Sequence, residues 1–193
     1  MPFDTVFFIN RFLAAVSQAV MEAGGRPHQY LGDGLMALFG LHTDPATACR
    51  QAVNAAAMVA GNVDHLNRML ADVEHSPIRF GIGIHAGEVI TGDIGYRDTI
   101  VFSAFGDTIN VTARLQDMTK EHECEVVLSD EVLKTAGLAR HGLPSTEVVI
   151  RGRADRLTVL TVTKAATLAA VLDDPQAADF ERTQERTDSS HIA

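Results

Sequence analysis

Apolar residues recur at helical spacing in two long stretches of the first half of the chain. The first covers residues 5–23 and stops at a pair of glycines. The second opens with Asp44-Pro45, a cap residue followed by a proline that suits the first helical turn, and extends toward Pro77. Its expected core stripe consists of Cys49, Val53, Ala56, Ala60, Val63, Leu66 and Leu70. These patterns predict two amphipathic helices.

Shorter apolar runs separated by turn residues predict strands. Residues 28–31 and 35–39 flank a glycine–aspartate–glycine turn, which predicts a β-hairpin with Asp33 at its tip. Residues 78–84 alternate in side-chain type, and we expect 88–92 to be their hairpin partner. The remaining pattern predicts a strand at 100–105, a helix at 107–118, a strand at 125–128, a short helix capped by Ser129, and strands at 148–150 and 157–162.

This order of elements predicts an α+β sandwich, in which helices pack on a largely antiparallel sheet. The 193 residues are a length usual for one domain. We expect that domain to cover residues 1–165, because the pattern fades after about residue 166. Residues 166–193 are expected to form a polar, flexible C-terminal tail.

Charge and cysteine content narrow the class of protein. The net charge of −9 argues against a nucleic-acid-binding surface. No apolar run approaches the ~18–20 residues that cross a bilayer, so no membrane contact is expected from this segment. The two cysteines, Cys49 and Cys124, are too few for a disulfide framework and favour a reduced, cytoplasmic location.

The aspartate between two glycines is the first candidate for chemistry. Glycines on both sides allow a ligand to approach closely, and carboxylates are preferred ligands of Mg²⁺. Asp33 is therefore a candidate metal ligand. The alternative is a plain hairpin turn, in which aspartate is favoured for its turn propensity, and the turn by itself favours that alternative.

Two further features carry polar groups on one face. Asn110 and Arg114 are four residues apart in a predicted helix, so an amide and a guanidinium lie side by side and can hold a ribose oxygen and a phosphate oxygen. Arg151 and Arg153 alternate around a glycine in an extended segment, which suits triphosphate binding. The alternatives are a solvated helix face and a charged strand edge, respectively.

Spacing excludes several common sites. Gly81, Gly83 and Gly87 do not have the spacing of a dinucleotide-binding loop. His85 has no second histidine or cysteine at metal-ligand spacing, so we expect it to serve packing. The sequence also contains no P-loop and no nucleophile elbow.

Three stretches, taken in order, resemble one family. They read YLGDGLMALFG at 30–40, GIGIHAGEVITGDIG at 81–95 and FGDTINVTARL at 105–115. Together they are similar to the catalytic domain of class III adenylate/guanylate cyclases, from about residue 4 to residue 162. The resemblance implies a ferredoxin-like (βαββαβ-type) sandwich with a mostly antiparallel sheet.

The resemblance also implies an activity, cofactors and partners. The family converts a nucleoside triphosphate, here ATP in preference to GTP, to the 3′,5′-cyclic monophosphate and pyrophosphate, with two Mg²⁺ or Mn²⁺ ions. It implies a homodimer with its sites at the interface, and upstream sensor or regulatory domains in a signalling protein.

Carried over by position, the resemblance implies roles for individual residues. Asp33 matches a metal ligand, Asn110 the residue that orients the ribose, and Arg114 the residue that stabilises charge on the α-phosphate. Gln29 and Ser103 match the two positions that bind the base, and Arg153 matches a basic residue that binds the terminal phosphates. In such enzymes Asp33 comes from one protomer, and the other protomer supplies Asn110, Arg114, Gln29 and Ser103.

The sequence departs from the family at two places. The family's domain opens with an apolar strand that carries a first metal aspartate, and no stretch here matches it. One carboxylate cannot replace a pair that bridges two ions, so this chain, as a domain lacking its first strand, is expected to be weakly active or inactive. Gln29 and Ser103 stand where adenylate-specific members have lysine with aspartate or threonine. The alternative is a degenerate cyclase-homology module that binds nucleotide or dimerises without turnover.

Overall fold

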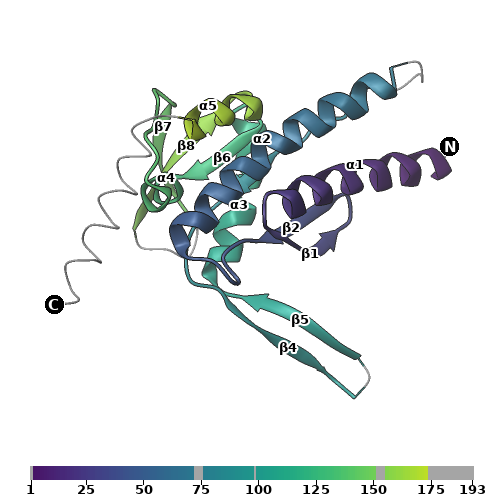
Figure 1. Cartoon of the computed structure of the whole chain (residues 1–193), viewed down its shortest axis with the longest axis horizontal. Helices are drawn as coiled ribbons and strands as arrows, with labels where there is room; N and C mark the ends of the chain where they lie inside the picture. The colour runs from purple at the N-terminus through teal and green to yellow at the C-terminus, as the bar shows by residue number, and fades with distance from the viewer. Residues whose placement is uncertain (1, 72–75, 98, 151–154, 174–193) are drawn as a thin grey trace.

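The computed structural model describes residues 2–71, 76–97, 99–150 and 155–173. Its helices are α1 (Pro2–Glu22), α2 (Pro45–Met69), α3 (Asp107–Glu121), α4 (Asp130–Ala136) and α5 (Leu168–Leu172), with a 3₁₀ turn η1 (Ala165–Thr167) before α5 (Figure 1). Its strands are β1 (Arg26–Leu31), β2 (Gly34–Leu38), β3 (Ile82–Ile84), β4 (Ile90–Tyr96), β5 (Thr99–Phe105), β6 (Val126–Ser129), β7 (Ser145–Val149) and β8 (Arg156–Val162).

Within the described residues the strands form separate sheets. β1 and β2 make one antiparallel hairpin and β4 and β5 make another, while the larger sheet has the order β3-β6-β8-β7. In the larger sheet β3 runs parallel to β6, and the other neighbours are antiparallel. The predicted α+β class is confirmed, and the helices pack on mixed sheets.

The predicted hairpin between residues 78–84 and 88–92 is wrong. The strand in the first segment is only Ile82–Ile84, and it pairs with β6. Residues 90–96 pair instead with β5, in continuous register from Ile90 opposite Phe105 to Tyr96 opposite Thr99. Alternation of side chains indicates that a segment is extended, but it does not specify which strand lies beside it.

The larger sheet is covered on both faces. Along β6, Val126 and Leu128 point to one face and Val127 to the other, and all three are fully buried. Helices α2, α4 and α5 pack on the first face. Helix α3 packs on the second face through Val111 and Leu115. The apolar side of α3 is therefore fixed, and so is the direction of its opposite, exposed side.

Helix α2 begins as the sequence predicts. Asp44 is the N-cap residue, and its carboxylate accepts a hydrogen bond of 2.9 Å from the backbone nitrogen of Thr47. This contact lowers the pKa of Asp44. All residues of the predicted core stripe are buried, and α1 packs on α2 through Ala19, Val59 and Val63. None of the helices in the described ranges combines the length and hydrophobicity that crossing a bilayer requires.

The packed part of the chain continues beyond residue 165. Leu168 and Val171 are buried in the core that α2 and β8 share. Glu125 holds the start of this segment, because its carboxylate accepts a hydrogen bond of 2.8 Å from the backbone nitrogen of Ala165 and pairs with Lys164 at 2.8 Å. The rest of the predicted tail, residues 174–193, lies outside the described residues.

The predicted cap of α4 has a different role. Ser129 occupies the N-cap position, but its hydroxyl makes no capping hydrogen bond. The hydroxyl oxygen lies 2.8 Å from Nδ1 of His85, and Ser129 is fully buried. His85 therefore ties the segment after β3 to the end of β6, in keeping with the packing role expected from the sequence.

A buried carboxylate at the start of α4 leads to the first prediction. The carboxylate of Asp130 accepts a hydrogen bond of 2.7 Å from Nε of Arg140, and its other oxygen lies 3.0 Å from Nζ of Lys134. The Arg140 hydrogen bond lowers the pKa of Asp130 below its ordinary value of 3.8, against an opposing effect of burial. We expect Asp130→Asn to destabilise the protein by about 1–3 kcal/mol at neutral pH.

The pH dependence tests the cause of that loss. Because the folded-state pKa is depressed, the contribution is present above the ordinary value of 3.8 and is lost as the pH falls through the lower, folded-state value. Denaturant unfolding of both proteins should therefore show a difference that shrinks below about pH 4. A difference that is the same at pH 7 and in acid would show that Asp130 does not act through its charge.

Candidate functional site

Asp33 lies at an exposed hairpin tip. Leu31 and Gly34 are paired across β1 and β2, so Gly32 and Asp33 form a two-residue turn. Gly32 has a φ of 65°, the left-handed region that a turn of this length requires at its first central position and that glycine adopts without strain. The Asp33 side chain is exposed. The predicted carboxylate-tipped hairpin is present.

Asn110 and Arg114 lie one turn apart on the exposed side of α3. Each is followed directly by a fully buried residue, Val111 and Leu115, so the helix cannot rotate without exposing its apolar side. The start of α3 is fixed as well, because the hydroxyl of Thr108 donates a hydrogen bond of 2.7 Å to the backbone oxygen of Glu88. The amide and the guanidinium are thus presented together to solvent.

Two glycines set the distance between α3 and the sheet. A Cβ atom at Gly83 would overlap the backbone of Thr112 and Gln116, and one at Gly81 would overlap the side chain of Thr119. These glycines, which do not match a dinucleotide-binding loop, therefore allow the close approach of helix and strand. They determine how far the Asn110–Arg114 face stands from the sheet.

The two predicted base-reading residues come from different hairpins. Gln29 is an exposed residue of β1, and Ser103 is half-buried on β5. The Ser103 hydroxyl donates a hydrogen bond of 3.1 Å to the backbone oxygen of Val101. Ser103 is paired with Gly92, where a Cβ would meet nothing within 4 Å, so the space beside the serine is open.

Sequence reasoning missed a contact that joins these two hairpins. The guanidinium carbon of Arg26 lies 4.3 Å from the centre of the Phe102 ring. The His28 ring meets the same phenyl ring edge to face, at 5.7 Å between centroids. Phe102 and Ser103 point to opposite faces of β5, so the contact brings the two strands together without bringing the Gln29 and Ser103 side chains into direct contact. No sequence signal identifies such a pair of residues from separate elements.

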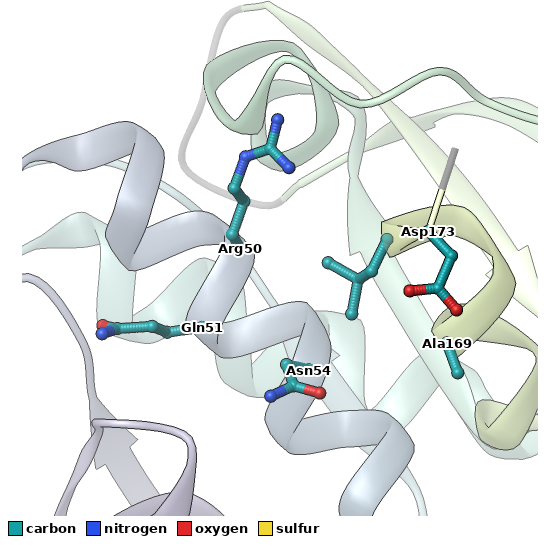
Figure 2. Close-up of a pocket in the computed structure, with 6 residues that line it drawn as sticks. Arg50, Gln51, Asn54, Ala169 and Asp173 are labelled. Carbon is teal, nitrogen blue, oxygen red and sulfur yellow. The ribbon is translucent and has the colours of Figure 1, made fainter. Parts of the chain in front are cut away.

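Arg153 and Arg151, the predicted phosphate-binding pair, lie outside the described residues. A hollow of about 380 Å³ lies between α2 and α5, and none of the predicted site residues lines it. Its lining residues, of which five are labelled in Figure 2, are Arg50, Gln51, Asn54, Ala169, Leu172 and Asp173. This hollow is therefore separate from the predicted site.

Comparisons with known proteins identify the family. The profile described as "Adenylate and Guanylate cyclase catalytic domain" matches residues 1–161, so the chain belongs to the class III nucleotidyl cyclase family. An adenylate cyclase of Anabaena cylindrica is 30% identical over 168 residues, which cover 83% of this chain and 32% of that protein. The terminal-differentiation-specific adenylate cyclase of Dictyostelium discoideum is 26% identical over 88% of this chain and 8% of its own length. The chain thus spans a third or less of these two relatives.

Solved structures agree on the fold. The guanylyl cyclase Cya2 superposes with a TM-score of 0.75 at 24% identity, covering 84% of this chain and 81% of that one. The adenylyl cyclase CyaB from P. aeruginosa superposes with a TM-score of 0.64 at 17% identity, covering 81% of each chain. Both likenesses show a shared fold.

The described residues do not fit the pair of metal ions implied by the family. Two neighbouring divalent ions need more than one carboxylate, because each ion has to be held by an anionic ligand. Asp33 presents one carboxylate, and no group of three histidine, cysteine, aspartate or glutamate side chains in the described ranges is placed to hold a metal ion. A complete two-ion site would need a second carboxylate from another segment.

Proposed function

We propose that this chain is the catalytic domain of a purine nucleotide cyclase that converts ATP, with GTP as the less favoured substrate, to the 3′,5′-cyclic monophosphate and pyrophosphate. The observation that carries the proposal is the joint exposure of Asn110 and Arg114 on α3, with the helix fixed by Val111 and Leu115 beneath them. An amide and a guanidinium at this spacing suit a ribose and a phosphate held side by side.

The proposed reaction assigns each residue a task. The ribose 3′-oxygen forms a bond to the α-phosphorus as its proton passes to solvent water, and the bond from that phosphorus to the oxygen of the leaving pyrophosphate breaks. Asn110 would orient the ribose, and Arg114 would stabilise the charge that develops on the α-phosphate oxygens. Gln29 and Ser103 would bind the base, and Arg153 would bind the terminal phosphates. Asp33 would contribute one carboxylate to the binding of metal ions.

A homodimer is the assembly that we propose for this site. Asp33 of one copy would face Asn110 and Arg114 of the other across a shared cleft. In support, one face of the β4–β5 hairpin is apolar and exposed, a property typical of interaction surfaces. Its exposed residues, which share that face by their register, are Ile90, Ile94, Tyr96, Val101 and Phe105.

A second candidate function is nucleotide binding without turnover. The observation that favours it is the Asp33 carboxylate, which does not by itself fit a two-ion site. Under this proposal Asn110 and Arg114 still bind the ribose and the phosphate, but the chain regulates or dimerises rather than catalyses.

Binding and turnover, measured separately, distinguish the two functions. We expect calorimetry to show ATP binding by the chain, weakened by Arg114→Ala because a phosphate contact is lost. Turnover is then assayed with Mn²⁺ in the strand-extended chain, meaning this chain with an apolar strand ending in aspartate placed ahead of Met1. Cyclic AMP from the strand-extended chain supports the enzyme, and binding without product supports the second function. Absence of both binding and product would contradict the two proposals together.

A further inference from the structure

The β4–β5 hairpin, called the arm below (Ile90–Phe105), projects from the rest of the molecule (Figure 1). Its base is anchored where the Thr108 hydroxyl donates its hydrogen bond to the backbone oxygen of Glu88, two residues before the arm begins. Tyr96, near the tip, is 74% exposed. A two-stranded hairpin of this kind is marginal without further packing, so its orientation depends on what holds it along its length.

The contact made by Phe102 supplies that support. Phe102 lies in the middle of β5, and Arg26 and His28 of β1 meet its ring at 4.3 Å and 5.7 Å. These three residues are called the Phe102 clamp. Both geometries are favourable ones, a cation over the aromatic face and an edge-to-face ring pair at 89°. The clamp joins the arm to the β1–β2 hairpin.

The backbone of β1 is shaped to make this contact. Pro27 pairs with Ala37 and Gln29 pairs with Met36, so His28 is an extra residue without a partner opposite it in β2. Such a bulge turns a side chain away from the regular alternation of the strand. The bulged residue is the one whose ring meets Phe102, while Gln29 keeps its place in the register.

The clamp sits beside both proposed base-reading positions. Gln29 follows His28 directly, and Ser103 follows Phe102 directly. Because Phe102 and Ser103 lie on opposite faces of the arm, the clamp holds β5 without covering the open space beside Ser103. Fixing His28 against Phe102 therefore fixes the separation of the backbones that carry Gln29 and Ser103.

We propose that the Phe102 clamp positions Ser103 relative to Gln29 and thereby sets the preference of the site between ATP and GTP. The inference rests on the proposed nucleotide site. Arg26, His28 and Phe102 act here as positioning residues, because they act through the two strands they join and not through contact with the base.

The chain offers a matched control. Arg97 lies over the Tyr96 ring at 5.0 Å, a contact of the same kind that stays within the arm. Arg97→Ala thus removes a cation–aromatic contact from the same hairpin without separating it from β1. Phe102→Tyr keeps the ring and serves as the conservative variant, whereas Phe102→Leu removes the aromatic face and edge.

The experiment measures nucleotide affinity and hydrogen exchange on the whole chain. Calorimetry with ATP and with GTP gives the ratio of the two dissociation constants for each variant. Phe102→Leu removes both ring contacts, and we expect it to change that ratio by about threefold to tenfold, within the range that aromatic contacts of these kinds contribute. We also expect faster amide exchange in β5 with unchanged exchange in α2. In Phe102→Tyr and in Arg97→Ala, the ratio of dissociation constants and the amide exchange of β5 should both stay close to those of the unaltered chain.

The outcomes separate the clamp from the proposed function. Equal weakening of ATP and GTP binding by Phe102→Leu, with the ratio unchanged, would overturn the positioning role and leave only a structural one. Unchanged exchange in β5 would overturn the clamp itself. If the unaltered chain binds neither nucleotide, the proposed function fails and the clamp's link to base preference fails with it. Faster exchange in Phe102→Leu would then still show that the clamp holds the arm.

Discussion

Replacing Arg114 by alanine is expected to lower the rate of cyclic nucleotide formation by the strand-extended chain by about 10²–10³-fold, the loss typical of one transition-state donor. The guanidinium is exposed on α3 beside Asn110 and carries a permanent positive charge. It can therefore stabilise the negative charge that develops on the α-phosphate oxygens. Asn110→Ala should cause a loss of similar size, because the ribose oxygen would no longer be held in line with the phosphorus. Initial rates of cyclic AMP formation from ATP with Mn²⁺, measured for the strand-extended chain and for each variant, test both expectations.

A basic residue on the same helix provides the control. Lys120 is exposed in the last turn of α3, away from the proposed site residues, so Lys120→Ala should leave the rate within about twofold. Arg114→Lys keeps the charge but loses the paired donors, and we expect an intermediate rate. Equal rates in the unaltered protein, Asn110→Ala and Arg114→Ala would defeat the assignment of both residues.

Gly83→Ala is expected to destabilise the fold by about 1–3 kcal/mol, the cost of overpacking a tight contact. The added Cβ would overlap backbone atoms of Thr112 and Gln116, and backbone cannot turn aside as the end of a flexible side chain can. The helix must therefore shift away from β3. Denaturant unfolding measures the loss, and any residual activity should fall as well because α3 carries Asn110 and Arg114.

A second glycine tests whether the effect comes from the contact. Gly61 lies inside α2, and a Cβ there would meet nothing within 4 Å. Gly61→Ala should therefore stabilise the protein by about 0.5–1 kcal/mol through helix propensity. Similar free energies of unfolding for the two variants would show that the contact between β3 and α3 is not tight.

Local signals in the sequence were sufficient for helices α1 to α4 and for the hairpin tip. In α2, the cap at Asp44, the proline after it and the apolar stripe all report on the same element, and the structure confirms each of them. The turn at Asp33 is specified in the same way, because Gly32 is needed for its left-handed conformation. Signals of this kind act over a few residues, so sequence reasoning detects them.

Long-range pairing could not be predicted in this way. The segment around Ile82 shows the alternation of a strand, but its partner β6 lies more than forty residues away and no local signal marks it. Helix α5 is only Leu168–Leu172, too short for a clear period, and the turn η1 before it is held by Glu125 from a distant part of the chain. The Phe102 clamp depends likewise on two hairpins meeting in space.

The candidate site combines both kinds of information. The sequence predicts that Asn110 and Arg114 share a helix face, and the structure adds that Gly81 and Gly83 set the height of that face above the sheet. Family membership is shown by the match over residues 1–161, whereas the choice of nucleotide and the activity stay proposals. Among the described residues the predicted metal ligand is Asp33, and its single carboxylate does not fit a pair of metal ions.

A crystal structure of the strand-extended chain with a non-cleavable ATP analogue and Mn²⁺ tests the central claim most directly. The proposal predicts two copies around a shared cleft. Arg114 of one copy should donate hydrogen bonds to the α-phosphate, and Asp33 of the other copy should face the same cleft. A structure in which Asp33 turns away from every groove that contains Asn110 and Arg114 of a neighbour would contradict it.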